Sequence, residues 1–213
     1  PVVDIGKLFL RFSPQNFHQL GFISIRFLPE KTVHDLCHFD KNWNHTDTTP
    51  IPDNGAFGIG GASRSDGLET VIGYAKSQGT SCIAKYDVDL NVDYTYYTPD
   101  AGWPDAEIIG GLVYSPNDTY LYAAGNGRLY KFEVATGNQV WAVAASNNFG
   151  DIVVDDDDDY LYTPDRNSGG MYLVKHRTLD GVSIDSTYNV FTTSHWGLAY
   201  DNDNDYVVCC GKL

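Results

Sequence analysis

A unit of about 45 residues recurs along the chain, and this repeat limits the fold more than any other feature of the sequence. Its clearest copy, 129-LYKFEVATGNQVW-141, is an alternating aromatic strand, a polar turn and a second strand. Three related segments follow the same pattern: 36–50, 83–97 and 173–191. The equivalent residues, spaced by 47, 46 and 44 positions, are Phe39, Tyr86, Phe132 and His176. Such regular spacing is typical of a repeat architecture.

A second landmark lies upstream of the first. An alternating strand enters a turn rich in Asp and Asn and leaves as an aromatic strand, which predicts a β-hairpin. Its copies are 111-GLVYSPNDTYLYAAG-125, 150-GDIVVDDDDDYLYTP-164 and 197-GLAYDNDNDYVVCCG-211. Tyr120 and Phe132 are 12 residues apart, whereas Tyr160 and His176 are 16 apart. We expect the four additional residues to form a loop insertion around 165-DRNSGG-170, since loops accept insertions readily.

Together the landmarks predict four short strands per unit, which is the size of one β-propeller blade. "LYKFE" is the expected third strand, "ATGN" the turn and "QVWAV" the fourth, outermost strand. The aromatic residues alternate because one face of each blade packs on its neighbour. The expected fold class is therefore all-β: a β-propeller of four-stranded antiparallel blades, with about four to five blades in this chain.

The same residues carry a family resemblance. "LYKFEVATGNQVW" resembles the repeat of quinoprotein-type (PQQ-like) propellers, and "YSPNDTYLYAAGNGRLYKFE" is similar to YVTN- and WD-like repeats. The resemblance is good over 106–145, looser over 55–100 and 149–195, and hardly extends to 1–33. It implies a blade, and blades of this type serve enzymes, scaffolds and receptors. A quinone site with a Trp floor, cations for the carboxylates and an Asp beside Ca²⁺ does not assemble from these residues, so no cofactor is expected from the resemblance.

The predicted units are an irregular N-terminal unit at 1–54, three blades at 55–105, 106–148 and 149–195, and half a blade at 196–213. Two arrangements of the ends remain open. Either the last hairpin joins the hairpin at 34–54 in a shared closing blade, or the chain is part of a larger propeller, which is the interpretation we favour. Open blade faces and edges are prone to association, so an oligomer is among the expected states.

Charge excludes several classes of partner. The chain has 14 Lys and Arg against 28 Asp and Glu, a formal charge of -14, and no segment gathers the basic residues. Phosphate groups are repelled by such a surface, so nucleic acid and anionic membranes are not expected partners. No apolar run reaches the about 18 residues of a transmembrane helix. The partner that we expect is a protein or a carbohydrate.

Two turns, 155-DDDDD-159 and 201-DNDND-205, are candidates for Ca²⁺ binding, because oxygen ligands at i, i+2 and i+4 are how acidic loops begin to wrap this ion. The full EF-hand pattern fails, since position 12 is Arg166 in one turn and Lys212 in the other. The alternative is a pair of solvated hairpin turns, as at 115-SPNDT-119. The residues to test as ligands are Asp155, Asp157, Asp159, Asp201, Asp203 and Asp205.

Aromatic residues recur in the connections between units. Trp103, Phe149 and Trp196 each precede the inner strand of the next unit, so they are expected to gather at one end of the central channel. With His195, beside Trp196, they are the candidate ligand-binding residues, and the alternative is that the rings are hydrophobic plugs between blades. His176, at the aromatic position of its repeat, is expected to be a packed and hydrogen-bonded ring.

No catalytic residue is predicted. The glycine-rich 60-GGASRSDG-67 lacks the nucleophile elbow and the P-loop pattern and is read as a hairpin turn. The sequence therefore favours a non-enzymatic propeller module that presents its inter-blade loops to a ligand. Two alternatives remain: a fragment of a quinoprotein-like or hydrolytic enzyme, and a structural component of an extracellular assembly or a virion.

Overall fold

The structure is a computed structural model, and it describes residues 21–22, 35–39, 45–50, 57–75, 81–89, 91–103, 109–147, 151–167, 170–189 and 194–212. Within these ranges all regular structure is β-strand, in 16 strands that form five antiparallel sheets. The all-β prediction is thus confirmed. In the same ranges no helix is long and apolar enough to span a bilayer.

Each sheet is built from strands that follow one another in the chain. The first contains β1 (Gly21–Phe22), β2 (Asp35–Phe39) and β3 (His45–Pro50). The second contains β4 (Phe57–Ser63), β5 (Glu69–Ala75), β6 (Ser81–Asp87) and β7 (Val92–Asp93). The third contains β8 (Ile109–Tyr114), β9 (Tyr120–Glu133) and β10 (Gln139–Asn147). The fourth contains β11 (Val153–Val154), β12 (Tyr160–Asn167), β13 (Gly170–Arg177) and β14 (Ser183–Asn189), and the fifth contains β15 (Ser194–Asp201) and β16 (Tyr206–Lys212).

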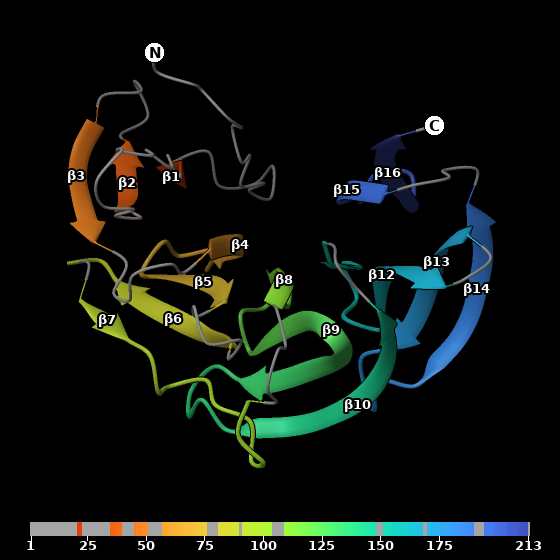
Figure 1. Ribbon diagram of the computed structural model, residues 1–213, viewed down its shortest axis with the longest axis horizontal. Helices are drawn as coiled ribbons and strands as arrows, with labels where there is room; N and C mark the ends of the chain where they lie inside the picture. Colours follow the sequence, from red (N-terminus) through yellow and green to blue (C-terminus); the bar gives the residue numbers. More distant parts are fainter. Residues whose placement is uncertain are drawn as a thin grey trace.

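The sheets stand side by side along an open arc, with β4, β8 and β15 toward its inside and β3, β10 and β14 toward its outside (Figure 1). This is the radial arrangement of propeller blades. The second to fourth sheets fall within the predicted units 55–105, 106–148 and 149–195, while β15 begins two residues before the predicted start at 196. We call each of these sheets a blade.

The third blade reaches four passes of the chain through β9, which doubles back on itself (Figure 1). Residues 121–125 of β9 pair with β8, and residues 126–132 pair with β10. The reversal falls at Asn126-Gly127, where Gly127 has a φ of 94° that glycine adopts without strain.

The pairing registers place the four repeat residues at equivalent positions. Each is the residue that closes the hairpin of the last two strands of its sheet. The pairs are Phe39 with His45, Tyr86 with Val92, Phe132 with Gln139, and His176 with Ser183. The predicted loop insertion at 165–170 is wrong, because Tyr160–Asn167 pairs residue by residue with Gly170–Arg177. The additional residues lengthen two strands, and the ladder hydrogen bonds satisfy their backbone groups.

The core lies between blades. Side chains of β9 alternate, so Leu121 and Phe132 join a cluster with Val71 and Ile83 of the second blade, while the opposite face packs on the fourth blade. The residues of that second cluster are Tyr122, Ala124, Leu129, Ile152 and Leu161. Blades buried on both faces explain why apolar residues occupy both alternating sets along β9.

The inner strands approach each other closely where they carry glycine. A Cβ atom at Gly60 of β4 would lie 2.5 Å from the carbonyl oxygen of Gly110 in β8, which is too close for any side chain. Among the described strands, β15 and β16 pair only with each other, so the last hairpin does not join β2 and β3 in one sheet.

Candidate interaction surface

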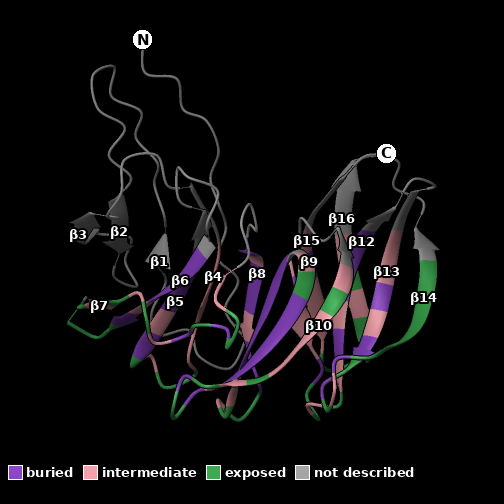
Figure 2. Cartoon of the chain, turned by 60° about the horizontal axis from the view of Figure 1, so that its bottom comes forward, coloured by how far each residue is buried: buried purple, intermediate pink, exposed green. Residues whose placement is uncertain are grey.

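Turns of two kinds gather at one end of the blades, at the bottom of Figure 2. Inner turns join the first and second strands of a blade: 64–68, 115–119, 155–159 and 201–205. Outer turns join the third and fourth strands: 87–91, 133–138 and 177–182. We call the surface formed by these seven turns the turn face.

The inner turns share one hydrogen-bonding scheme. The first residue donates its N–H to the carbonyl of the sixth, at 2.9 Å from Arg64, 2.8 Å from Ser115 and 3.1 Å from Asp155. The fourth residue is left-handed in three of them, with φ values of 72° at Gly67, 56° at Asp118 and 59° at Asp158. Asp tolerates this conformation better than most residues. The acidic composition of these turns is therefore compatible with their geometry.

The outer turns explain the polar segment between the two strands of the repeat. Gly137 and Gly181 have φ values of 72° and 71° and donate their N–H groups to Glu133 and Arg177. A Cβ atom at Gly137 would also clash with the carbonyl oxygen of Tyr96 from the preceding blade. The glycine of "ATGN" thus serves both a left-handed turn and a close contact between blades.

Hydrogen bonds connect the turns of neighbouring blades. The hydroxyl and N–H groups of Ser65 donate to the carboxylate of Asp118 in the next blade. The hydroxyl of Tyr122 donates to Asp158 of the following blade at 2.8 Å. These two left-handed Asp residues act as latches between blades, a role that the sequence reasoning missed.

Almost all of the net charge lies on the turn face. Its seven turns contain fourteen acidic residues and two arginines, which amounts to 12 of the 14 net negative charges of the chain. Both arginines are engaged locally, Arg64 with Asp66 at 2.7 Å and Arg177 with Asp180 at 2.5 Å. The rest of the chain is close to neutral. A concentrated field of one sign attracts cationic partners and raises their association rate.

Exposed aliphatic side chains accompany these charges. Leu68, Val88 and Leu179 lie in three of the turns and are 56%, 57% and 80% exposed. Single exposed apolar residues are common, but Val88 and Leu179 each lie beside an acidic residue of the same turn, and the N–H of Leu68 donates to the carboxylate of Asp66. The turn face therefore offers apolar contact as well as charge.

The acidic turns use part of their carboxylates internally. Asp155 is buried, and its Oδ1 accepts the N–H groups of Asp159 and Tyr160 at 2.8 and 3.0 Å. Burial and the nearby Asp157 raise the pKa of Asp156, and burial raises the pKa of Asp158. In the described part of the chain no three His, Cys, Asp or Glu side chains are grouped as metal ligands. Calcium binding by the two turns stays a prediction.

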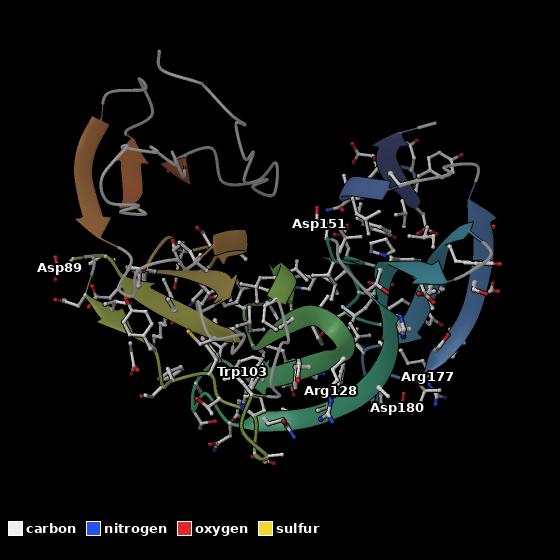
Figure 3. All side chains as sticks on the ribbon, viewed as in Figure 1. Asp89, Trp103, Arg128, Asp151, Arg177 and Asp180 are labelled. Carbon is white, nitrogen blue, oxygen red and sulfur yellow. The ribbon has the colours of Figure 1, made fainter. Side chains whose placement is uncertain are left out.

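Trp103 lies between the second and third blades (Figure 3). Its ring centroid is 5.3 Å from that of Tyr130 and 6.3 Å from that of Phe132, both on β9. The connecting segment also places Tyr96 on the third blade, where its hydroxyl donates to the carbonyl of Val134 at 2.8 Å. These contacts support the alternative that Trp103 is an inter-blade plug, and its ligand-binding role stays a prediction.

The other ligand candidates are placed only in part. Phe149 lies outside the described residues, and His195 and Trp196 are described as backbone of β15. The β15–β16 register shifts between His195 and Gly197, so Trp196 occupies a β-bulge. Equivalent shifts enclose Ile59 in β4 and Gly110 in β8, which makes the bulge a repeated device of the inner strands. Bulges commonly re-aim a side chain beside functional sites.

Asp151, two residues before β11, is a residue that the sequence reasoning missed. Its Oδ2 accepts the N–H of Leu198 in β15 at 3.0 Å, so it joins the fourth and fifth blades two residues beyond the bulge. In the repeat, its position corresponds to Gly60, Gly111 and Gly197. The sequence signal that could have identified Asp151 is a carboxylate at a position that is glycine in the other units.

A buried carboxylate also joins the second and third blades. Glu69 is 5% exposed, and its Oε1 accepts the hydroxyl groups of Tyr97 at 2.6 Å and Tyr114 at 2.7 Å. Its Oε2 lies 3.4 Å from Nζ of Lys85. Burial, with the Glu69 carboxylate nearby, raises the pKa of both tyrosines well above the ordinary range. The cluster is a satisfied polar network inside an inter-blade core.

Comparison with known proteins establishes the fold. The structure is similar to Kuenenia stuttgartiensis hydrazine synthase, with a TM-score of 0.67 and 13% identity over 95% of this chain and 57% of that chain. A chain of the mitotic checkpoint complex gives a TM-score of 0.67 and 14% identity over 92% of this chain and 59% of that one. A functionally unknown protein from Desulfotomaculum acetoxidans DSM 771 gives a TM-score of 0.58 and 17% identity over 89% of this chain and 58% of that one.

At these identities the likeness shows the fold alone, a β-propeller. The chain spans less than three-fifths of the length of these solved chains. No family model matches the sequence, and no curated protein does.

Proposed function

We propose that this chain is a non-enzymatic β-propeller interaction module whose turn face binds a protein partner with a basic surface. The observation that carries the proposal is the segregation of charge, with 12 of 14 net negative charges on seven turns of one face. The turns are held by main-chain hydrogen bonds and by latches between blades, so the charged surface is ordered before a partner arrives. The same charge argues against a nucleic-acid partner.

The enzymatic alternatives have less support. The residues that carry the PQQ-like resemblance have packing roles: Phe132 is fully buried, and Nε1 of Trp141 donates to the carbonyl of Thr178 in the next blade at 3.0 Å. The resemblance therefore accounts for the blade without a cofactor. A carbohydrate ligand at Phe149, His195 and Trp196 is a separate proposal, for which Asp151 is the neighbouring carboxylate to test.

The test compares two charge variants of equal net charge. Asp157→Asn/Asp203→Asn removes two turn-face carboxylates that make no side-chain hydrogen bond within the described structure. Asp100→Asn/Asp185→Asn removes two exposed carboxylates outside the seven turns. Binding of a fluorescent ten-residue lysine peptide is measured by anisotropy from low to physiological salt.

We expect the turn variant to bind the peptide about threefold to tenfold more weakly, because a rim charge near the cation contributes about 1 kcal/mol. Its binding should also depend less steeply on salt. The control variant should match the wild type. Equal losses in both variants would mean that only total charge matters, and the proposed surface would be wrong.

A further inference from the structure

Leu179 is the most exposed large apolar side chain among the described residues. It is 80% exposed and lies in the outer turn 177–182 of the fourth blade. The same place in the repeat is held by Asp89 in the second blade and by Ala135 in the third, and both are exposed. The third blade has a neighbour on each side (Figure 1), so exposure at this position is a property of the blade itself. The fourth blade therefore presents an aliphatic side chain where the other two have an acidic or a small one.

The main chain beside this leucine is fixed by contacts with two other turns and strands. Thr178 is 5% exposed, its N–H donates to the carbonyl of Asp159 at 3.0 Å, and its hydroxyl donates to the carbonyl of Asp158. Its own carbonyl accepts Nε1 of Trp141 at 3.0 Å and Nζ of Lys131 at 3.1 Å, both from the third blade. Both main-chain polar groups of Thr178 are thus bonded in the free protein. A side chain on such an ordered turn loses little conformational entropy when a partner binds.

The turn that carries Leu179 is also closed by its own hydrogen bonds. The N–H of Gly181 donates to the carbonyl of Arg177 at 2.8 Å, and the guanidinium of Arg177 lies 2.5 Å from the carboxylate of Asp180. The same carboxylate accepts the N–H of Val182 at 3.1 Å. These bonds hold the turn through its main chain and its charged residues. An exposed leucine adds little packing to them, so the fold does not account for a large apolar residue at this position.

The most acidic turn of the chain lies directly beside Leu179. The hydrogen bonds of Thr178 join the outer turn to 155–159, in which every residue is Asp. Asp156, Asp157 and Asp159 are exposed. A cation bound by these carboxylates would place its neighbouring residues next to the leucine. Charge and apolar surface therefore occur together at this part of the turn face.

We propose that Leu179 is the apolar anchor of the turn face, and that the partner is a basic amphipathic segment. An apolar side chain of the partner packs on Leu179, while its lysine or arginine residues meet the carboxylates of 155–159. The inference rests on the proposed function and adds to it, because charge alone attracts any cationic surface, whereas the anchor selects cations that alternate with apolar residues. Electrostatic attraction raises the association rate, and burial of the leucine lowers the dissociation rate.

The probes are two fluorescent peptides of equal length and charge, the leucine peptide KKLKKLKKLK and the serine peptide KKSKKSKKSK. Their binding to the intact 213-residue chain is measured by anisotropy at physiological salt. We expect the wild type to bind the leucine peptide more tightly than the serine peptide. Leu179→Ala should weaken the leucine peptide about threefold to tenfold, the effect of removing roughly half of one leucine side chain from water, and leave the serine peptide unchanged.

Two further variants serve as controls. Ile184→Ala removes an exposed aliphatic side chain of the same size from β14, outside the seven turns, and should affect neither peptide. Leu179→Met keeps an apolar side chain and should retain most of the preference for the leucine peptide. Equal losses for the two peptides in Leu179→Ala, or the same loss in Ile184→Ala, would overturn the proposal.

Amide hydrogen exchange tests whether the anchor is ordered before binding. The N–H groups of Thr178 and Gly181 are hydrogen-bonded, so they should exchange slowly in the free chain. Fast exchange at both amides would show that the turn becomes ordered only on binding, and it would overturn the argument for a fixed anchor.

The charge variant Asp157→Asn/Asp203→Asn separates this inference from the proposed function. It leaves Leu179 in place, so it should weaken both peptides by the same factor. If it does so while Leu179→Ala changes neither peptide, the turn face binds cations and the anchor is refuted. If the charge variant changes neither peptide, the proposed function fails. In that case a leucine preference that still depends on Leu179 supports the anchor, and loss of that dependence overturns it.

Discussion

The hydrogen-bonded network around Glu69 should contribute measurably to the free energy of unfolding of the protein. Replacing Glu69 by Leu removes the acceptor of two buried hydroxyl groups, at 2.6 Å from Tyr97 and 2.7 Å from Tyr114, and the counter-charge of Lys85 at 3.4 Å. Each unsatisfied buried hydroxyl costs about 1–3 kcal/mol. Loss of the ion pair costs less than the about 3–5 kcal/mol of a fully buried pair, because the Lys85 side chain is 23% exposed. These terms overlap, so we expect a loss of about 3–6 kcal/mol in the free energy of unfolding.

The assay is urea unfolding followed by far-UV circular dichroism and by tyrosine and tryptophan fluorescence, with coincidence of the two probes as the test for two-state behaviour. Asp66→Asn on the surface is the control and should leave the midpoint nearly unchanged. The triple variant Glu69→Leu/Tyr97→Phe/Tyr114→Phe should recover a large part of the loss, since removing all partners leaves fewer unsatisfied groups. A cost below about 1 kcal/mol for Glu69→Leu, or no recovery in the triple variant, would refute the reasoning.

Three further predictions follow from single contacts. Trp103→Ala should cost about 2–4 kcal/mol in urea unfolding, because the ring packs on Tyr130 and Phe132, and a ligand-only role would leave stability unchanged. Burial lowers the pKa of His176 below 6.5, so the unfolded chain binds more protons, and stability should fall as pH drops below about 6.5. The melting temperature of His176→Phe should therefore fall less than that of the wild type between pH 7.5 and 5.5. Parallel curves of melting temperature against pH for the two proteins would contradict this prediction. Gly137→Ala should destabilise the chain by more than 1 kcal/mol through its positive φ and its contact with Tyr96, as measured by thermal melting beside a Gly102→Ala control that shares the φ without the contact.

Much of the fold could be predicted from the sequence because strand alternation and turn composition are local properties. The hairpins at 111–125, 150–164 and 197–211 form as expected, since each alternating run is interrupted by a turn that Asp, Asn and Gly favour. His176 is buried and bonded to Thr163 at 3.0 Å, so its expected role as a packed ring is confirmed. The repeat failed as a guide at 165–170, where two longer strands absorb the residues that a loop was expected to hold.

The contacts between blades were not predicted, because they depend on which residues meet across an interface. The Ser65–Asp118 latch joins residues 53 positions apart, and the Tyr122–Asp158 latch joins residues 36 apart. The sequence signal that could have indicated such contacts is a residue that departs from the repeat. Glu69 stands where other units have Tyr, and Asp151 stands where they have Gly, and both proved to be carboxylates that connect neighbouring blades.

Some acidic residues of the turn face accept hydrogen bonds that hold the fold together, and others do not. The residues without such bonds are the stronger argument for a partner. Asp118, Asp155 and Asp158 accept hydrogen bonds that hold turns and blades together. Within the described residues Asp157 and Asp203 have no such side-chain bond, although they add to the repulsion on a face that is already strongly negative. These two carboxylates therefore do not stabilise the fold. Replacing both by Asn should therefore leave the melting temperature equal or higher while weakening the binding of the lysine peptide. A lower melting temperature would show that the two carboxylates stabilise the fold.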